Sequence, residues 1–301
     1  MLDILPEKFP FDVVIDSDTG NETDDQFAVA FALLRPDIFR IKALLSAPFF
    51  HYRVLSPAEG EYVSHLEQKR ILHYFPDTDT VLWRGMNSFY SANAPVSCGV
   101  RKLVELSRNY SAENPLVIIC IATLSNMAQA LKLDPTLPSR TVLLWLGSHG
   151  YGLPPDEFNL VQDLTASEIV LNSGWRKLIF PCLQVAEKIS ITWQAAEKLF
   201  TADGIGGFLR HRLLRHFSWS YGQYDPDAKL KLWDMFPVAA LADRNVADFS
   251  VQKKRKLLLD PLMWQETEEF EVTAVDVDRN RVFTLLDNAV AAAKFLQPPD
   301  F

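Results

Sequence analysis

The sequence is short of the features that mark secreted, membrane-spanning and nucleic-acid-binding proteins. It has only three cysteines, an odd number that cannot all pair, and two of them lie in apolar runs typical of core strands. No apolar stretch reaches the roughly 18 residues of a membrane-spanning helix, and the first residues lack the basic start and apolar core of a secretory leader. Acidic residues outnumber basic ones by 38 to 30, giving a net charge of −8, which disfavours a nucleic-acid backbone as partner. We therefore expect a cytoplasmic protein with no membrane or nucleic-acid partner.

The composition is that of a single folded enzyme-sized domain. The chain has 301 residues and 48% apolar character, enough to bury a large core. No internal repeat or low-complexity linker divides it. Aromatic and basic residues gather in 211–231 and charged ones in 243–256, so we expect one domain over 1–301 with surface elaborations around 211–256.

Apolar runs typical of buried strands alternate with helical patterns along the chain. Helical periodicity is present at 26–34, 57–72 and 99–108. The strand-like runs lie near Val13, Ile41, Val81, Val117, Val142 and Leu178. Repeated strand-then-helix units predict an α/β fold with a mostly parallel central sheet flanked by helices.

A dense acidic cluster follows the first predicted strand. The run at 13–15 delivers Asp16, Asp18, Asp24 and Asp25 into one short loop before a helix. A single such Asp would be read as a helix cap, but four together repel one another unless a cation or raised pKa values relieve the repulsion. An all-oxygen set suits Ca²⁺ or Mg²⁺ better than zinc or copper. The carboxyl end of a strand is also where open α/β sheets bind ligands.

Two other acidic motifs fit the loop less well. An EF-hand starting at Asp16 would need an oxygen ligand where Gly20 stands and a bidentate Glu where Phe27 stands. The nucleophile motif of haloacid-dehalogenase phosphohydrolases needs Thr at the position of Gly20, together with a later acidic metal loop that this chain lacks. That phosphohydrolase class is the alternative enzyme reading.

The acidic loop resembles the Asp-x-Asp-x-Gly-x-Asp-Asp signature of the calcium-dependent nucleoside hydrolases, the inosine-uridine-preferring superfamily. Three residues, 21–23, separate Gly20 from Asp24 where the usual family member has one, so the loop must bulge to return Asp24 and Asp25 to the metal. Further segments similar to family motifs follow in order, and the resemblance spans roughly residues 10–290. It implies the Rossmann-like fold of these enzymes.

The resemblance also implies a set of calcium ligands. Thr-Leu-Ser-Asn at 123–126 is similar to a family motif whose Thr gives a backbone carbonyl to calcium, and Ser125 takes that place. Asp234 occupies the position of the last carboxylate ligand. By resemblance, Ca²⁺ is held by Asp18, Asp25, Asp234 and the Ser125 carbonyl, and Asp18 also accepts a proton from the attacking water. Asp16 is expected to support the loop.

Substrate contacts follow from the same comparison. Glu-Phe-Asn at 157–159 is similar to the family segment that grips ribose, which implies that Glu157, Asn159 and Asp24 bind ribose hydroxyls. Trp233 stands where many members have a catalytic His, and a purine-preferring branch with Trp-Asp here stacks the indole on the base. For the leaving base we expect His149 as a contact, with His51 as the other candidate.

The sequence therefore predicts an N-glycosyl hydrolase that releases ribose and free base from a ribonucleoside or related riboside, with a purine-like base favoured. A role in purine salvage, a small-molecule riboside partner and inversion at the anomeric carbon would follow. The oligomeric state stays open, a homo-oligomer being one option. The replaced His leaves a second reading, a relative that binds calcium and ribose without turnover.

Overall fold

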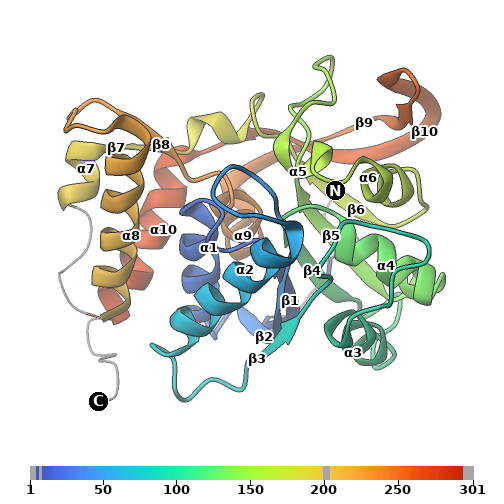
Figure 1. Cartoon of the computed structure of the whole chain (residues 1–301), viewed down its shortest axis with the longest axis horizontal. Coiled ribbons are helices and arrows are strands. Elements are labelled where there is room, and N and C mark those ends of the chain that lie inside the picture. The colour runs from blue at the N-terminus through green and yellow to red at the C-terminus, as the bar shows by residue number, and fades with distance from the viewer. Residues whose placement is uncertain (1–4, 7–8, 199–203, 294–301) are drawn as a thin grey trace.

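An eight-stranded sheet runs through the middle of the protein (Figure 1). The computed structural model describes residues 5–6, 9–198 and 204–293. Neighbouring strands pair in parallel except for β10 and β9, which are antiparallel. In spatial order the strands are β3 (Val81–Arg84), β2 (Phe39–Ser46), β1 (Phe11–Ser17), β4 (Leu116–Ile121), β5 (Thr141–Leu146), β6 (Lys177–Phe180), β10 (Leu262–Val277) and β9 (Ala247–Leu259).

Helices cover both faces of the sheet (Figure 1). Each layer has its own apolar core. Val13 and Ile15 of β1 face one core and Val14 faces the other, as the alternation of side chains along a strand requires. One layer holds α1 (Asp24–Leu33), α2 (Pro57–Leu72), α8 (Gly204–Tyr221), α9 (Met235–Ala242) and α10 (Arg279–Ala292). The other holds α3 (Cys98–Ser107), α4 (Ser125–Leu133) and α6 (Leu164–Leu171).

Shorter elements connect these layers. β7 (Ser190–Thr192) and β8 (Lys229–Lys231) form a separate antiparallel pair. The remaining helical turns are α5 (Phe158–Val161), α7 (Trp193–Lys198) and three 3₁₀ segments at Leu137–Ser139, Ala186–Lys188 and Arg244–Val246. Among the described residues, no helix combines the length and apolar character needed to cross a bilayer.

The predicted α/β class is confirmed, and the predicted elements lie close to the observed ones. All six expected strands are present as β1 to β6, and α2 has the expected bounds. Helix α1 begins at Asp24, two residues before the expected start at 26. Asp24 and Asp25 are therefore its first turn, where the positive end of the helix dipole favours negative charge.

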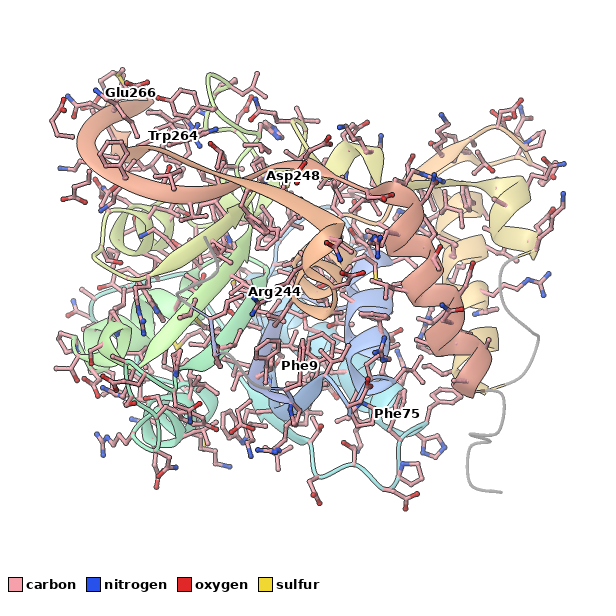
Figure 2. All side chains as sticks on the ribbon, turned by 180° about the vertical axis from the view of Figure 1, so that it is seen from behind. Phe9, Phe75, Arg244, Asp248, Trp264 and Glu266 are labelled. Carbon is pink, nitrogen blue, oxygen red and sulfur yellow. The ribbon has the colours of Figure 1, made fainter. Side chains whose placement is uncertain are left out.

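The segment 243–256 is more than the surface elaboration that we expected. It contains most of β9, which pairs along its length with β10 and extends the central sheet through β6. Figure 2 shows this hairpin with Asp248, Trp264 and Glu266 along it. The charged run conceals the strand because it lies at a sheet edge with one face exposed. Arg255 in that run is nevertheless buried, with its guanidinium 4.7 Å from the Trp264 ring centre.

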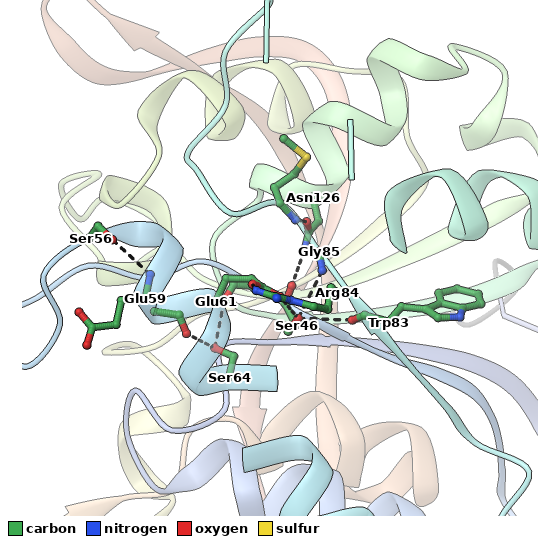
Figure 3. A network of polar contacts seen from close by, with 12 residues as sticks. Ser46, Ser56, Glu59, Glu61, Ser64, Trp83, Arg84, Gly85 and Asn126 are labelled. Atoms are coloured by element: carbon green, nitrogen blue, oxygen red, sulfur yellow. Dashed lines mark hydrogen bonds and ion pairs between the residues drawn. The ribbon is translucent and has the colours of Figure 1, made fainter. Parts of the chain in front are cut away.

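A polar network fixes the carboxyl ends of β2 and β3, the two strands at one edge of the sheet (Figure 3). The Ser46 hydroxyl donates to Glu61 of α2 at 2.6 Å, and the fully buried Glu61 pairs with Arg84. The Asn126 amide, from α4, donates to the Ser46 carbonyl at 3.1 Å and to Asp16 at 2.7 Å. These bonds join β1, β2, β3, α2 and α4 beside the acidic loop, and so hold its base in place.

Candidate metal and riboside site

The acidic loop connects the end of β1 to the start of α1 and folds back on itself. The backbone N–H of Asn21 donates to the Asp18 carbonyl at 2.9 Å, and Gly20 takes a left-handed conformation with φ of 101°. This conformation favours glycine because glycine has no Cβ atom to clash with the backbone. The Ser17 hydroxyl donates to Asp25 at 2.6 Å across the loop. The extra residues 21–23 thus bulge while Asp25 returns to the strand end.

Three buried carboxylates meet at this loop. Oxygen atoms of Asp24, Asp25 and Asp234 all lie within 4.8 Å of one another. Asp234 is the residue just before α9. Its backbone N–H donates to Asp24 at 3.3 Å. Burial raises the pKa of Asp24 to about 7, and it raises the pKa values of Asp25 and Asp234 well above their usual range, with repulsion between neighbouring carboxylates adding to the effect. This oxygen-only set fits a hard divalent cation, which would relieve the repulsion.

Asp18 lies beside this cluster without belonging to it. Its carboxylate accepts a hydrogen bond from the Asn21 amide at 2.9 Å. Burial raises the pKa of Asp18 well above its usual range, and the charge of Asp24 raises it further. A cation bound beside Asp18 would lower this pKa and keep the carboxylate ionised, and an ionised carboxylate can accept a proton.

Glu157, which precedes α5, and Asn159, within α5, approach the cluster from the segment that follows β5. Glu157 caps α5 and accepts backbone N–H bonds from Ser148 (3.2 Å), Asn159 (2.9 Å) and Leu160 (3.0 Å). Burial raises the pKa of Glu157 to about 7 despite these donors. The Asn159 amide donates to the Leu146 carbonyl at the end of β5, at 3.1 Å. Both side chains are therefore held in fixed orientations.

These groups line one cavity of about 140 Å³ at the carboxyl ends of β1, β4 and β5. The chain order of strands reverses around β1, as at the ligand sites of other open α/β sheets. Trp233 is half-buried on the cavity wall, and its buried indole N–H has no partner among the described residues. The predicted residues that line the cavity are Asp18, Asp24, Asp25, Glu157, Asn159, Trp233 and Asp234.

Two predicted site residues lie elsewhere. Ser125 is the first residue of α4, and its hydroxyl donates to Asp163 at 2.6 Å. His149 lies in the loop after β5, with Nε2 3.5 Å from a carboxylate oxygen of Asp156. Neither residue lines the cavity, so their roles stay predictions. Asp16, in β1, accepts a hydrogen bond from the Asn126 amide and is not among the residues that line the cavity.

Two contacts that the sequence did not reveal hold the inserted residues 21–23. The Thr23 hydroxyl and Nδ1 of His216, on α8, share a hydrogen bond of 2.8 Å, and His216 is buried. Arg53 donates to the Asn21 carbonyl, and its guanidinium lies 3.6 Å from the ring centre of Trp219 on α8. The partners are far apart in the chain, so no local pattern signals them.

His216 should make an acid-sensitive contribution to the stability of the protein. Burial, aided by the charge of Arg53, lowers the pKa of His216 to about 4, against about 6.5 in the unfolded chain. At this group the unfolded state binds more protons between these values, so the contribution of His216 to stability is retained above pH 6.5 and falls with decreasing pH down to about 4. From pH 7 to pH 5 the loss should be about 2 kcal/mol.

Denaturant unfolding of wild type and His216→Gln at both pH values measures this difference. The variant should lose about 2 kcal/mol less than wild type on acidification. His211→Gln, on the exposed side of the same helix, is the matched control and should behave as wild type. Equal acid losses in wild type and His216→Gln would show that His216 does not carry the effect.

Solved structures with the same fold include nucleoside hydrolases and a type III effector protein. A plant nucleoside hydrolase superposes with a TM-score of 0.74 at 19% identity, covering 94% of this chain and 99% of that chain. A purine-preferring ribonucleoside hydrolase from Gardnerella vaginalis gives 0.72 at 17% identity, covering 94% and 98%. The type III effector protein XopQ, solved with adenosine diphosphate ribose, gives 0.69 at 15% identity, covering 96% and 95%. At these identities the likeness shows the fold.

The sequence itself places the chain in a family. The model of the inosine-uridine preferring nucleoside hydrolases matches residues 77–284, well over half of the chain. This protein therefore belongs to the inosine-uridine preferring nucleoside hydrolase family. The matched residues include Glu157, Asn159 and Asp234 but begin after the acidic loop, which bears the three inserted residues. No curated protein sequence matches the chain.

Proposed function

We propose that this protein binds Ca²⁺ in the acidic cavity and hydrolyses the N-glycosidic bond of a ribonucleoside or related riboside. The observation that carries the proposal is the convergence of Asp24, Asp25 and Asp234 with Glu157 and Asn159 in one buried cavity. A cation bound here would act as a Lewis acid. It would lower the pKa of the attacking water, so that a hydroxide nucleophile is available at neutral pH. Family membership disfavours the phosphohydrolase alternative.

The chain's own residues then have separate tasks. Asp18 accepts the proton of the attacking water, since its carboxylate lines the cavity beside the cluster. Glu157 and Asn159 bind ribose hydroxyls and fix the sugar. The buried carboxylates also place negative charge beside the positive charge that develops on the sugar as the bond to the base breaks. Water attack without a covalent sugar intermediate inverts the anomeric carbon.

Asn159 offers the cleanest test of ribose binding, because Glu157 also caps α5. We expect Asn159→Ala to lower kcat/KM for ribosides by roughly ten- to a hundredfold, as when a hydrogen bond to a polarised group is lost. Calcium affinity, measured by calorimetry, should stay within about threefold of wild type. Asn93→Ala, an exposed asparagine away from the cavity, is the control. Native turnover by Asn159→Ala would make the Glu-Phe-Asn segment a bystander.

Trp233 supports a preference for purine-like bases. Its half-buried indole lines the cavity next to Asp234, and stacking on a base adds about 0.5–1.5 kcal/mol that grows with ring overlap. We expect inosine to be cleaved faster than uridine, and Trp233→Ala to reduce that ratio about fivefold while Trp233→Phe keeps most of it. If both rates fall equally with a lowered melting temperature, the indole is only packed. Purine release would fit a salvage role.

A second candidate function is riboside binding without turnover. It is favoured by one observation: among the described residues, no histidine lines the cavity to protonate the departing base. Incubation with a nucleoside panel and calcium separates the two readings. Release of free ribose and base supports hydrolysis, whereas saturable nucleoside binding with no product supports the non-catalytic protein.

A further inference from the structure

A second cavity of about 160 Å³ adjoins the acidic one. It lies behind the inserted loop, between α2 and α8, and Glu22 lines both cavities. Its walls differ sharply in charge from those of the first cavity. Four arginines line it, namely Arg53, Arg70, Arg212 and Arg215, together with the face of Trp219.

The second cavity is positive within a strongly negative protein. Its only acidic residues are Glu22 and Glu67, so its net charge is +2, four arginines less two glutamates, in a chain of net charge −8. Glu67 forms ion pairs with Arg70 and Arg212, each with a nitrogen–oxygen distance of 2.7 Å. Arg53 and Arg215 have no carboxylate within ion-pair distance among the described residues. Glu22 and Asp18 offset part of the charge of Arg53, so Arg215 is the arginine whose charge is most available to a ligand.

Two features make these guanidiniums suited to an anion. Arg53 is held flat, 3.6 Å from the ring centre of Trp219, with Nε and one terminal nitrogen bonded to His51 and the Asn21 carbonyl. These contacts fix its orientation and leave its other terminal nitrogen for a ligand. Arg215 is exposed on α8 and lines the same cavity without an ion-pair partner among the residues described. A guanidinium presents its donors in a planar fork that matches the oxygens of a phosphate or a carboxylate.

We propose that this second cavity binds an anionic group of the riboside whose sugar occupies the first, so that the substrate is an anionic riboside. The inference rests on the proposed function. The acidic cavity alone repels an anionic ligand, and the basic cavity beside it supplies a compensating attraction. The two cavities together therefore favour a riboside whose negative group lies in the basic cavity while its sugar lies in the acidic one. The anionic group is a phosphate on the sugar or a carboxylate on the base.

Matched substrate pairs test the proposal and show whether the anionic group is on the sugar or on the base. Inosine is compared with inosine 5′-monophosphate, and uridine with orotidine, which carries a carboxylate on the base. We expect the anionic member of one pair to have at least about tenfold higher kcat/KM. A preference in the first pair places the group on the sugar, and a preference in the second places it on the base.

Arginine variants tie the preference to the cavity. Arg215→Gln should reduce the anionic-to-neutral ratio of kcat/KM roughly tenfold, and Arg215→Lys should retain part of it because the charge remains. Arg210→Gln, on the same helix but outside the cavity, should leave the ratio unchanged. Equal cleavage of neutral and anionic ribosides by wild type would overturn the inference while leaving the proposed function standing.

Binding of inorganic phosphate keeps the two proposals separable. In calorimetry at low ionic strength, wild type should bind phosphate, and Arg215→Gln should bind it about tenfold more weakly. If no riboside is cleaved but this pattern holds, the proposed function fails and the anion site stands. If phosphate does not bind, or binds Arg215→Gln as tightly as wild type, the anion site is wrong.

Discussion

Replacing Asp234 by Asn should weaken calcium binding by roughly a hundredfold or more and abolish riboside hydrolysis. One of three carboxylates in the cluster loses its charge while the side chain keeps its shape, and carboxylate charge is what holds a hard cation. Calcium titration by calorimetry and a free-ribose assay measure the two losses.

Stability separates this result from misfolding. Without calcium, Asp234→Asn should melt at a higher temperature than wild type, because the substitution removes one of the mutually repelling buried charges. Asp248→Asn, at an exposed position on β9, is the charge-matched control and should bind calcium normally. Calcium affinity in Asp234→Asn equal to that of wild type would refute the metal assignment.

Asp18→Asn should lower kcat by about 10²- to 10⁴-fold, the range for loss of a general base. Asp18 lines the cavity but lies outside the cluster of three carboxylates, so the calcium affinity of the variant should fall much less than its rate. This expectation differs from the resemblance, which makes Asp18 a calcium ligand and predicts that both are lost together.

Two measurements on the same variant resolve this point. Calcium affinity within about tenfold of wild type, alongside the large rate loss, would make Asp18 a base acting next to the cation. Loss of both would return Asp18 to the ligand set that the family motif implies. A kcat within tenfold of wild type would remove Asp18 from the mechanism altogether.

Much of the fold can be predicted because its strands are buried on both faces. All six residues of β4 are buried, and such continuous apolar runs are readable in the sequence. The β9–β10 hairpin escapes this reasoning. Its exposed face interrupts the apolar pattern, and the burial of Arg255 depends on Tyr151, about a hundred residues away.

The candidate site likewise has residues that the sequence indicates and contacts that it does not. Asp18, Asp24 and Asp25 are close in sequence, and their residue type alone indicates a cation. The position of Glu157 follows from a motif after β5, because a parallel sheet gathers its strand ends at one edge. Asp234 follows β8, outside that sheet, and its place is indicated only by the family resemblance. The bond between Thr23 and His216 joins residues 193 apart in the chain, and no spacing rule predicts it.

The most direct test is ribose release from inosine by chelator-treated protein, with and without added calcium. The account predicts release of free ribose and hypoxanthine that requires calcium and is absent in Asp18→Asn. Protein that binds calcium and inosine yet releases no ribose at any calcium concentration would contradict hydrolysis and leave the non-catalytic reading.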